Sequence, residues 1–388
     1  MKIIIATDTY YPNIGGAAYF AQRLASALQK DGHTILVIAA SRRLHSEFFK
    51  HKGVEIFGPA SFPFKIFNNF RLPFPFFLKM KIKKVMKNFK PDIVHIQGHF
   101  LTSDAVYLSA KDMGVPVVGT SHFLPENVLH YFHLPAPAEK LVWKIAWKQL
   151  RGVFDKIDFA TTPTQTAIQQ LRKIGFARPV TAISCGIDLQ RFNKNNDGRY
   201  LKTRYSIPDK PVLLYVGRLD EEKKLDDVLR AVAVALKNTD FHFVIAGVGC
   251  MDKSLKELVR ELEIVNSVSF IGFVPDEDLP NLYPIASCFV IAGMAELQSI
   301  VTLEALASGL PVIAVNFLAL PELVKPGENG YLFEPKDIGG LSQYITKILS
   351  DENLRKKMSE KSLEIIKAHD FNETVRRFES IYSSLKKI

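Results

Sequence analysis

Two glutamates, Glu296 and Glu304, stand eight residues apart around a predicted strand-to-helix junction. An apolar run over residues 288–292 predicts the strand, and the apolar spacing after Ser299 predicts a helix that ends at Gly309. The first amides of such a helix can bind an anion such as a phosphate. A sugar nucleotide fits this setting, because its hydroxyl groups can donate to the carboxylates while the amides hold its diphosphate. A surface helix with acidic residues in its first turn gives the same spacing, so both interpretations stay open here.

Further residues of suitable chemistry follow other predicted strands. Gly15 and Gly16 come after the first strand and open a helix, where a backbone without Cβ atoms can approach a phosphate closely. Arg218 and Lys223 come after a strand over residues 211–217 and could bind a diphosphate, the arginine through parallel N–H groups and the lysine as a point charge. A simple turn explains the glycines equally well, and solvated surface charges explain the two cations.

Three histidines lie in or just after predicted strands of the first half. Ligands of open α/β sheets bind at the carboxyl ends of the strands, and His99 and His122 both fall at that edge. Either imidazole could bind a substrate or take part in catalysis, and we expect this role for His122 rather than His99. His95 lies inside its strand, so we expect it to be a core residue with satisfied hydrogen bonds.

The elements that must position these residues are alternating strands and helices. The chain has 388 residues, which exceeds one ordinary core and predicts two α/β domains. Parallel strands joined through helices require right-handed crossovers and give doubly wound sheets. A polar stretch after residue 192 marks the boundary. We expect an N-terminal domain over residues 1–190, a second domain over 200–365, and a helix over 366–388 that returns to the first domain.

Composition narrows the cellular setting. No run of 18 apolar residues occurs, so we expect no transmembrane helix, and the start of the chain predicts a strand rather than a signal peptide. The cysteines, Cys185, Cys250 and Cys288, are far apart and form no CxxC motif. This pattern predicts free thiols in a reducing cytosol and no zinc site.

The charge is unevenly distributed. Residues 1–190 contain 24 Lys and Arg against 12 Asp and Glu, and the segment 62–90 holds eight Phe and eight basic residues with no acid. Aromatics interleaved with lysines are typical of a membrane surface, where Phe enters the interface and Lys meets anionic headgroups. Two alternatives are a core helix that buries Phe77, Met80 and Val85, and a nucleic-acid surface. We prefer the membrane, since no nucleic-acid motif accompanies the charge.

Taken together and in this order, the motifs resemble the retaining glycosyltransferases of the GT-B fold, in the large family that includes sucrose-phosphate synthases and bacterial lipid mannosyl- and glucosyltransferases. The resemblance covers nearly the whole chain and implies an α/β fold with two Rossmann-like doubly wound domains facing across a cleft. Its carriers are Gly15-Gly16, Gly119-Thr120-Ser121-His122, Gly186-Ile187-Asp188, Val216-Gly217-Arg218-Leu219 with Lys223, and the segment from Glu296 to Gly309-Leu310-Pro311-Val312.

The resemblance implies a role for each motif. Gly16 approaches the β-phosphate, and Arg218 with Lys223 neutralises the diphosphate of the donor. Glu296 contacts the donor sugar, Glu304 the ribose, and His122 the sugar near its reacting face. The implied residues are, for catalysis, His122 and Glu296; for the donor diphosphate, Gly15, Gly16, Arg218, Lys223, Ser299, Ile300 and Val301; for the donor sugar, ribose and base, Leu297, Gln298, Glu304 and Val274; and for the acceptor, Tyr10, Tyr11, Glu126 and Asn127.

The chain departs from the family pattern at several positions. A loop in which glycine is common holds Leu297, Gln298 and Ser299 here. Lys224 stands where glycine is usual, and Cys185 where asparagine is usual. The Gln298 loop and the run from Ser121 to Asn127 look most like members that glycosylate membrane lipids. None of these changes removes a charge named above.

The resemblance also implies chemistry without a metal, in which positive side chains and a helix dipole stabilise the leaving group. Asp276 and Asp278 form an Asp-x-Asp pair that could hold a metal, but acids at a predicted helix start explain them more simply.

We therefore expect a peripheral enzyme on the cytosolic face of a membrane. It would transfer a hexose, with retention, from a UDP- or GDP-linked sugar to a lipid acceptor, and the basic segment 62–90 would bind the anionic membrane. The alternatives are a soluble glycosyltransferase for polysaccharides or small sugars, and a non-catalytic protein that binds sugar nucleotides or acts as a scaffold.

Overall fold

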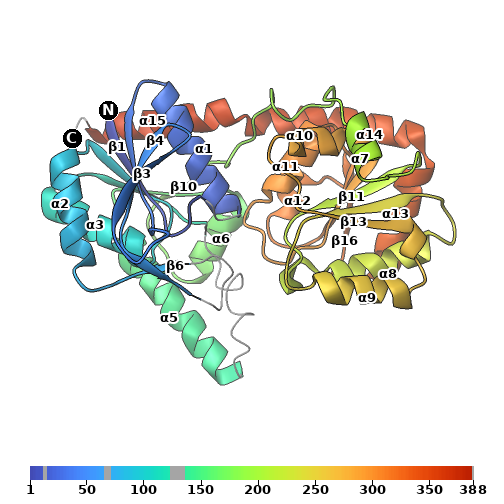
Figure 1. Cartoon of the computed structure of the whole chain (residues 1–388), viewed down its shortest axis with the longest axis horizontal. Helices are drawn as coiled ribbons and strands as arrows, with labels where there is room; N and C mark the ends of the chain where they lie inside the picture. Colours follow the sequence, from blue (N-terminus) through green and yellow to red (C-terminus); the bar gives the residue numbers. More distant parts are fainter. Residues whose placement is uncertain (12–14, 65–70, 123–135, 387–388) are drawn as a thin grey trace. The chain divides into compact units, whose positions relative to one another are not determined.

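The computed structural model describes residues 1–11, 15–64, 71–122 and 136–386, and divides them between two compact units. Unit 1 comprises Met1–Ser184 together with the C-terminal segment from Glu373, and unit 2 comprises Cys185–Asn372. The chain therefore begins in unit 1, passes through unit 2 and ends in unit 1 (Figure 1). In the described part of the chain, no helix is both long and apolar enough to cross a bilayer.

Unit 1 is built on a largely parallel sheet with the strand order β10-β9-β8-β7-β1-β2-β4-β3, in which only β3 pairs antiparallel. Its central strands are continuous apolar runs, as expected for strands covered on both faces. The strands are β1 (Lys2–Ala6), β2 (Thr34–Ile38), β3 (Glu47–His51), β4 (Val54–Gly58), β7 (Ile93–Ile96), β8 (Val117–Thr120), β9 (Phe159–Thr162) and β10 (Val180–Ala182), with a separate hairpin of β5 (Ser61–Pro63) and β6 (Arg71–Pro73).

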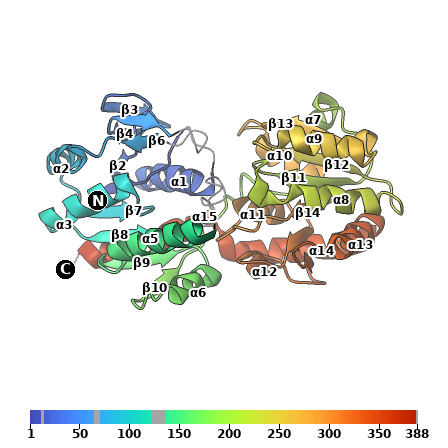
Figure 2. The same ribbon diagram turned by 90° about the horizontal axis from the view of Figure 1, so that it is seen from below.

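The helices of unit 1 follow the strands along the chain. Helix α1 packs on β2 and β4, and α3 packs on β1 and β7 with α2 beside it (Figure 2). Their bounds are α1 (Gly16–Lys30), α2 (Leu78–Phe89), α3 (Leu101–Met113), α5 (Ala136–Phe154), α6 (Gln165–Lys173) and α15 (Phe371–Lys386). Helix α15 is the C-terminal element, and it buries Phe378 and Tyr382 completely within unit 1.

The core-helix alternative for segment 62–90 was wrong about which residues face inward. Helix α2 forms within this segment, but it buries Leu78, Ile82 and Met86 instead of Phe77, Met80 and Val85. The buried residues recur every four positions and so share one face of the helix. Phe77 precedes the helix, and both Phe77 and Met80 are exposed.

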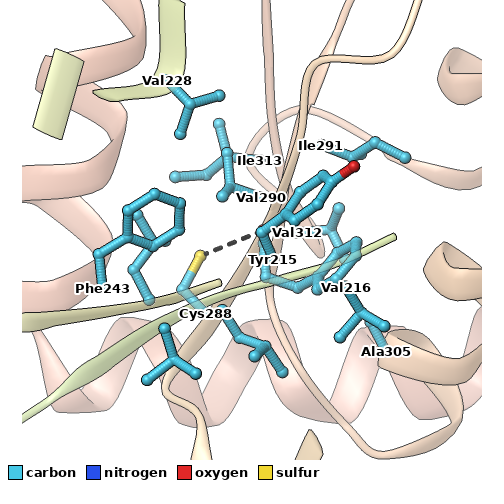
Figure 3. Close-up of a cluster of buried hydrophobic side chains, with 14 of the residues drawn as sticks. Tyr215, Val216, Val228, Phe243, Cys288, Val290, Ile291, Ala305, Val312 and Ile313 are labelled. Atoms are coloured by element: carbon cyan, nitrogen blue, oxygen red, sulfur yellow. Dashed lines mark hydrogen bonds between the residues drawn. The ribbon is translucent and has the colours of Figure 1, made fainter. Parts of the chain in front are cut away.

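Unit 2 is built on a parallel sheet with the order β13-β12-β11-β14-β15-β16. Side chains of its central strands, including Tyr215, Phe243 and Cys288, form the apolar core (Figure 3). The strands are β11 (Val212–Val216), β12 (His242–Ala246), β13 (Val268–Gly272), β14 (Cys288–Ile291), β15 (Val312–Val315) and β16 (Gly330–Phe333).

The helices of unit 2 alternate with these strands. Helices α8 and α9 lie side by side, and α11 packs on β14 and β15 (Figure 1). The α-helices are α7 (Arg199–Arg204), α8 (Leu225–Ala235), α9 (Asp252–Glu261), α10 (Leu279–Leu282), α11 (Ile300–Ala307), α12 (Leu320–Leu323), α13 (Ile338–Ser350) and α14 (Glu352–Ile365). Short 3-10 helices are η2 (Glu221–Lys223), η3 (Val265–Ser267), η4 (Tyr283–Ile285) and η5 (Ile366–His369).

Candidate active site

The first two strands of unit 2 end in loops whose backbones nearly touch. A Cβ atom on Gly247, after β12, would lie 1.8 Å from the carbonyl oxygen of Gly217, after β11. Only glycine permits so close an approach. The loop after β11 is fixed further because the Tyr215 hydroxyl donates to the carbonyl oxygen of Arg218 at 2.7 Å. The side chain of Arg218 therefore starts from a rigid position at the carboxyl edge of the sheet.

Arg218 is held by two acids from its own loop. Its guanidinium donates to the carboxylate of Asp220 and, at 2.5 Å, to that of Glu222. The two carboxylates are 7% exposed, whereas the arginine side chain is 40% exposed. The acids thus lie beneath the guanidinium and leave part of it facing solvent.

Lys223 forms the second ion pair of this edge. Its Nζ lies 2.6 Å from Oε1 of Glu296, and both side chains are largely buried. The backbone N–H of Met294 donates to the carbonyl oxygen of Glu222 at 3.0 Å, which joins the loop of Glu296 to η2. Lys224 follows with φ 49°, in the left-handed region that glycine adopts without strain, so the structure explains why glycine is usual there.

Helix α11 begins directly after the Glu296 loop. Ser299 is its N-cap, and its hydroxyl accepts from the N–H of Thr302. The first intrahelical bond runs from the Leu303 N–H to the Ser299 carbonyl, so the amides of Ile300 and Val301 precede the helical ladder. The predicted anion-binding amides therefore belong to a capped helix start.

Glu304 lies one turn into α11 and is 7% exposed. Its Oε2 accepts a hydrogen bond from the hydroxyl of Tyr283 at 2.6 Å. Tyr283 is fully buried, and this burial together with the nearby Glu304 carboxylate raises its pKa well above the usual value, so it remains a donor. One oxygen of Glu304 is thus oriented by the protein before any ligand binds.

The other residues predicted to bind the sugar, ribose or base of the donor substrate differ in their exposure. Gln298 accepts through Oε1 from the backbone N–H of Cys185 at 2.6 Å, so two departures from the family pattern contact each other. Leu297 and Val274 are buried, whereas Phe273, next to Val274, is exposed. A contact between Val274 and a base stays a prediction.

In unit 1, His122 lies near the start of α1. Gly16 opens that helix, and the ring of Phe20, one turn later, packs 5.1 Å from the ring of His122. Nε2 of His122 lies 2.9 Å from Oε1 of Gln97, and burial lowers the pKa of His122 to about 4. His99, the residue that we did not prefer, is completely buried against Phe100.

The residues predicted to bind the acceptor substrate differ in their exposure. Tyr10 is buried, which raises the pKa of its hydroxyl, whereas Tyr11 is exposed and stacks on His51 with ring centroids 3.8 Å apart. Glu126 and Asn127 lie outside the described residues.

The Asp-x-Asp pair makes ion pairs within unit 2. Asp276 contacts Arg191 at 2.8 Å, and Asp278 contacts Arg204. Both carboxylates are therefore engaged by guanidinium groups.

Two family models match this chain in succession. Residues 201–364 match the model for glycosyl transferases group 1, and residues 14–191 match that for glycosyltransferase family 4. The chain belongs to the GT-B glycosyltransferases of group 1. The family and the α/β fold that the sequence motifs imply are confirmed.

Proteins similar to this glycosyltransferase are named for different products. It is 28% identical to alpha-monoglucosyldiacylglycerol synthase of Streptococcus pneumoniae, over 97% of this chain and 85% of that protein. In fold it resembles sucrose-phosphate synthase of Thermosynechococcus elongatus, with a TM-score of 0.81, 18% identity and 99% of both chains covered. A protein of Anabaena solved in complex with UDP-glucose has a TM-score of 0.78 at 17% identity, covering 99% of this chain and all of that one.

The predicted residues of the glycosyltransferase thus form two groups. Unit 2 holds Arg218, Lys223 and Glu296 in one network of ion pairs and loop contacts, with Glu304 on the adjoining helix. Unit 1 holds His122 near the start of α1. A diphosphate bound by residues of both units stays a prediction.

Four residues around these groups were missed from sequence. Asp220 and Glu222 hold Arg218, Tyr283 orients Glu304, and Gln97 contacts His122. Asp220 and Glu222 lie next to Arg218 in the sequence, where acids at the start of a helix are common. Tyr283 and Gln97 gave no signal, because their partners are 21 and 25 residues away in the sequence.

Proposed function

We propose that this glycosyltransferase transfers a hexose, with retention of anomeric configuration and without a metal ion, from a nucleotide-diphosphate sugar to a membrane lipid. The observation that carries the proposal is the Lys223–Glu296 ion pair, with its 2.6 Å separation, beside Arg218 at the carboxyl edge of the unit 2 sheet. Cations for a diphosphate and a carboxylate for sugar hydroxyls lie there on adjoining loops.

Each group has a defined role in this proposal. Arg218 and Lys223 neutralise the diphosphate, and the amides of Ile300 and Val301 donate to its oxygens. Glu296 accepts from hydroxyl groups of the hexose through the oxygen that is not paired with Lys223. Glu304 accepts from the ribose of a UDP- or GDP-linked donor, and relatives of this chain include proteins named GDP-mannose-dependent alpha-mannosyltransferase.

The proposed chemistry depends on stabilising the leaving group. As the bond between the anomeric carbon and the phosphate oxygen breaks, negative charge grows on the diphosphate, and fixed cations and amides stabilise that charge without reorganising. The acceptor hydroxyl attacks from the same face, and its proton passes to the departing phosphate oxygen. Retention follows, and neither a metal ion nor a protein base is required.

A lipid acceptor is supported by the exposed surface around α2. Phe76, Phe77 and Met80 are 80%, 68% and 64% exposed, and they adjoin the lysines of α2. Exposed aromatics beside lysines suit an interface with anionic lipid. The name of the Streptococcus relative, alpha-monoglucosyldiacylglycerol synthase, supports a lipid acceptor as well.

A groove of about 810 Å³ runs beside the same helix in unit 1. Its lining combines apolar side chains of β3, β4 and α2, among them Phe48, Phe57 and Val85, with Lys81 and Lys84. The membrane surface of this proposal therefore comprises Phe76, Phe77, Met80, Lys81 and Lys84. We place this surface at the cytosolic face, because Cys185, Cys250 and Cys288 are not joined in disulfide bonds in the described structure, which suits a reducing compartment.

The donor site is tested by thermal-shift screening with UDP- and GDP-linked hexoses, with and without Mg²⁺. We expect one donor to raise the melting temperature equally in both conditions. The variant Glu296→Gln should lose transfer of that sugar, whereas Glu334→Gln, an exposed carboxylate elsewhere in unit 2, should retain it. A non-catalytic protein would bind a donor but show neither hydrolysis nor transfer in the wild type.

The lipid acceptor is tested separately by flotation with vesicles of phosphatidylglycerol and phosphatidylcholine. Binding should fall with added salt and should be lost in Phe76→Ser/Phe77→Ser and in Lys81→Glu/Lys84→Glu. The pair Lys253→Glu/Lys357→Glu makes the same charge change on unit 2 and should still bind. Wild-type protein that stays unbound at low salt, yet glycosylates a soluble sugar, would replace the lipid with a soluble acceptor.

A further inference from the structure

A chain of buried hydrogen bonds joins His122 to the C-terminal helix within unit 1. Nε2 of His122 lies 2.9 Å from Oε1 of Gln97, and Nε2 of Gln97 lies 3.0 Å from Nε2 of His95. Nδ1 of His95 lies 2.6 Å from the hydroxyl of Tyr382 on α15. The path crosses from the end of β7 to α15 and connects a predicted catalytic residue with the last helix of the chain.

The amide of Gln97 gives this chain a direction. An amide oxygen only accepts and an amide nitrogen only donates. With the Gln97 amide oriented in this way, Nε2 of His122 carries the hydrogen that it donates to Oε1 of Gln97. Nε2 of His95 accepts from the Gln97 amide, so the hydrogen of the His95 ring is on Nδ1 and is donated to Tyr382.

Packing holds the members of the chain in place. His95 is completely buried, and its ring lies 4.9 Å from that of Phe378 and 5.7 Å from that of Tyr382, both on α15. Gln97 is buried as well, and its backbone N–H donates to the carbonyl of Ala6 at 2.7 Å. The ring of His122 is therefore oriented by groups that have little freedom to move.

Hydroxyl groups complete the surroundings of His95. The Thr120 hydroxyl lies 2.7 Å from Nε2 of His95 and 2.6 Å from the Thr161 hydroxyl. With Nε2 of His95 as an acceptor, the Thr120 hydroxyl donates to that nitrogen together with the Gln97 amide and accepts from the Thr161 hydroxyl.

The imidazoles of this chain are neutral at physiological pH. Burial lowers the pKa of His122 to about 4 and that of His95 to about 3, with the proximity of His122 adding to the effect on His95. A neutral imidazole with hydrogen on Nε2 has a lone pair on Nδ1. Nδ1 of His122 is then an unprotonated hydrogen-bond acceptor, and it attracts a hydroxyl group more than an anion.

We propose that Gln97 is a positioning residue that holds His122 in the Nε2–H tautomer, so that Nδ1 accepts a hydrogen bond from a hydroxyl group of the donor hexose. This inference rests on the proposed function for the identity of the ligand. It assigns His122 to sugar recognition rather than to the diphosphate, and it makes a hydroxyl group at that position a requirement for a good donor.

The tautomer can be measured without any activity assay. In full-length protein labelled with ¹⁵N-histidine, the His122 signals are identified by their loss in His122→Asn. We expect a protonated Nε2 and an unprotonated Nδ1 in wild type, and a mixture of tautomers in Gln97→Leu. The opposite tautomer in the wild type, or an unchanged spectrum in Gln97→Leu, would overturn the inference.

Kinetics test the consequence for sugar recognition. We expect Gln97→Leu to lower kcat/KM for the active donor on the order of 10- to 100-fold, since a misplaced contact is costly in the transition state. Affinity for the corresponding nucleoside diphosphate, which has no hexose, should not change, and Gln97→Asn should restore part of the rate. Gln29→Leu, at a glutamine that bonds Gly53 on the surface, is the matched control and should behave as wild type.

The two proposals fail in different ways. A wild type that transfers no hexose removes the proposed function, while the ¹⁵N spectrum still decides whether Gln97 sets the tautomer. Normal transfer by Gln97→Leu with a folded structure removes the role of Gln97 and leaves the proposed function intact. A deoxy donor that lacks the contacted hydroxyl should show the reduced rate in wild type and no further loss in Gln97→Leu.

Discussion

Two cationic side chains of the candidate site, Arg218 and Lys223, are paired with acids before any donor sugar nucleotide binds. Asp220 and Glu222 lie beneath the partly exposed guanidinium of Arg218, and Glu296 holds Lys223. Fixed side chains lose less entropy on binding than mobile ones, so these pairs pre-organise the site. They also weaken its positive field, and a diphosphate bound as proposed would share the cations with three carboxylates.

Replacing Lys223 should reveal the strength of its contact with the diphosphate. Lys223→Met keeps the length of the side chain but removes the charge, and it leaves Glu296 without its cation. Hydrogen bonds to charged groups contribute about 1.5–3 kcal/mol, so affinity for the nucleoside diphosphate should fall about tenfold or more. Calorimetric titration measures the change, with Lys253→Met as a control. Equal affinities in Lys223→Met and wild type would place the diphosphate elsewhere.

Tyr283 offers a subtler change at the ribose side. Tyr283→Phe removes only the hydroxyl that donates to Glu304 at 2.6 Å, in a buried setting. The freed carboxylate loses its orientation, so we expect nucleoside affinity to fall roughly tenfold while kcat at saturating donor changes little. Titration and steady-state kinetics separate the two effects. In contrast, Tyr344→Phe, at a ring that stacks on Tyr331, should alter neither.

At the scale of elements, the start of α11 is fixed by one hydroxyl. Ser299 is buried and caps the helix whose first amides are proposed to bind the diphosphate. Ser299→Ala should lower the free energy of unfolding by about 1 kcal/mol, because an N-cap is lost. Donor affinity should fall too, since the amides of the first turn become less ordered. Urea unfolding and titration measure these, with Ser350→Ala, at the end of α13, as a control that keeps donor affinity.

Elements were predictable where local chemistry decides them. The apolar runs of β11 and β14 and the glycine after α11 follow from patterns of a few residues, and these elements end within a residue or two of the expected bounds. The face of α2 was not predictable with the same rules. The helix begins at Leu78, after a segment that contains Pro73 and Pro75. The sequence pattern did not indicate where the helix starts, and so did not show that Leu78, Ile82 and Met86 face inward.

Candidate residues on motifs were likewise accessible from sequence, whereas the groups that orient them were not. Arg218, Lys223 and Glu296 were named, and the structure joins them in one network. Their support comes from contacts between distant segments, and such pairs leave no local pattern. The hydrogen bond from His95 to Tyr382 spans 287 residues of sequence.

At the scale of the whole molecule, the last helix returns to the unit in which the chain began. Glu379 of α15 contacts His33 at 2.8 Å, and Lys386 contacts Asp92 at 3.1 Å. With the buried Phe378 and Tyr382, these contacts make α15 an integral part of unit 1. The described fold of unit 1 therefore includes α15, and the hydrogen-bond chain of its histidines ends on that helix.

This buried chain makes the stability of unit 1 depend on pH. Burial lowers the pKa of His95 to about 3, while an unfolded histidine titrates near 6.5. Below pH 6.5 the unfolded chain binds more protons, so stability is fully present above that pH and declines as pH falls toward the folded pKa. His95 alone should account for a loss of about 2 kcal/mol between pH 6.5 and pH 5. Urea unfolding at both pH values measures it.

The contribution of His95 to this pH dependence is isolated with a variant in which residue 95 cannot titrate. His95→Gln keeps polar atoms near Tyr382 and Thr120, so it should fold, although with lower stability at pH 7. The unfolded chain of this variant binds one proton fewer on acidification, because residue 95 no longer titrates. Its free energy of unfolding should therefore fall less between pH 6.5 and pH 5 than that of wild type. His45→Gln removes an exposed histidine and should retain the wild-type dependence. The same pH dependence in His95→Gln and wild type would show that His95 is not the group kept neutral by burial.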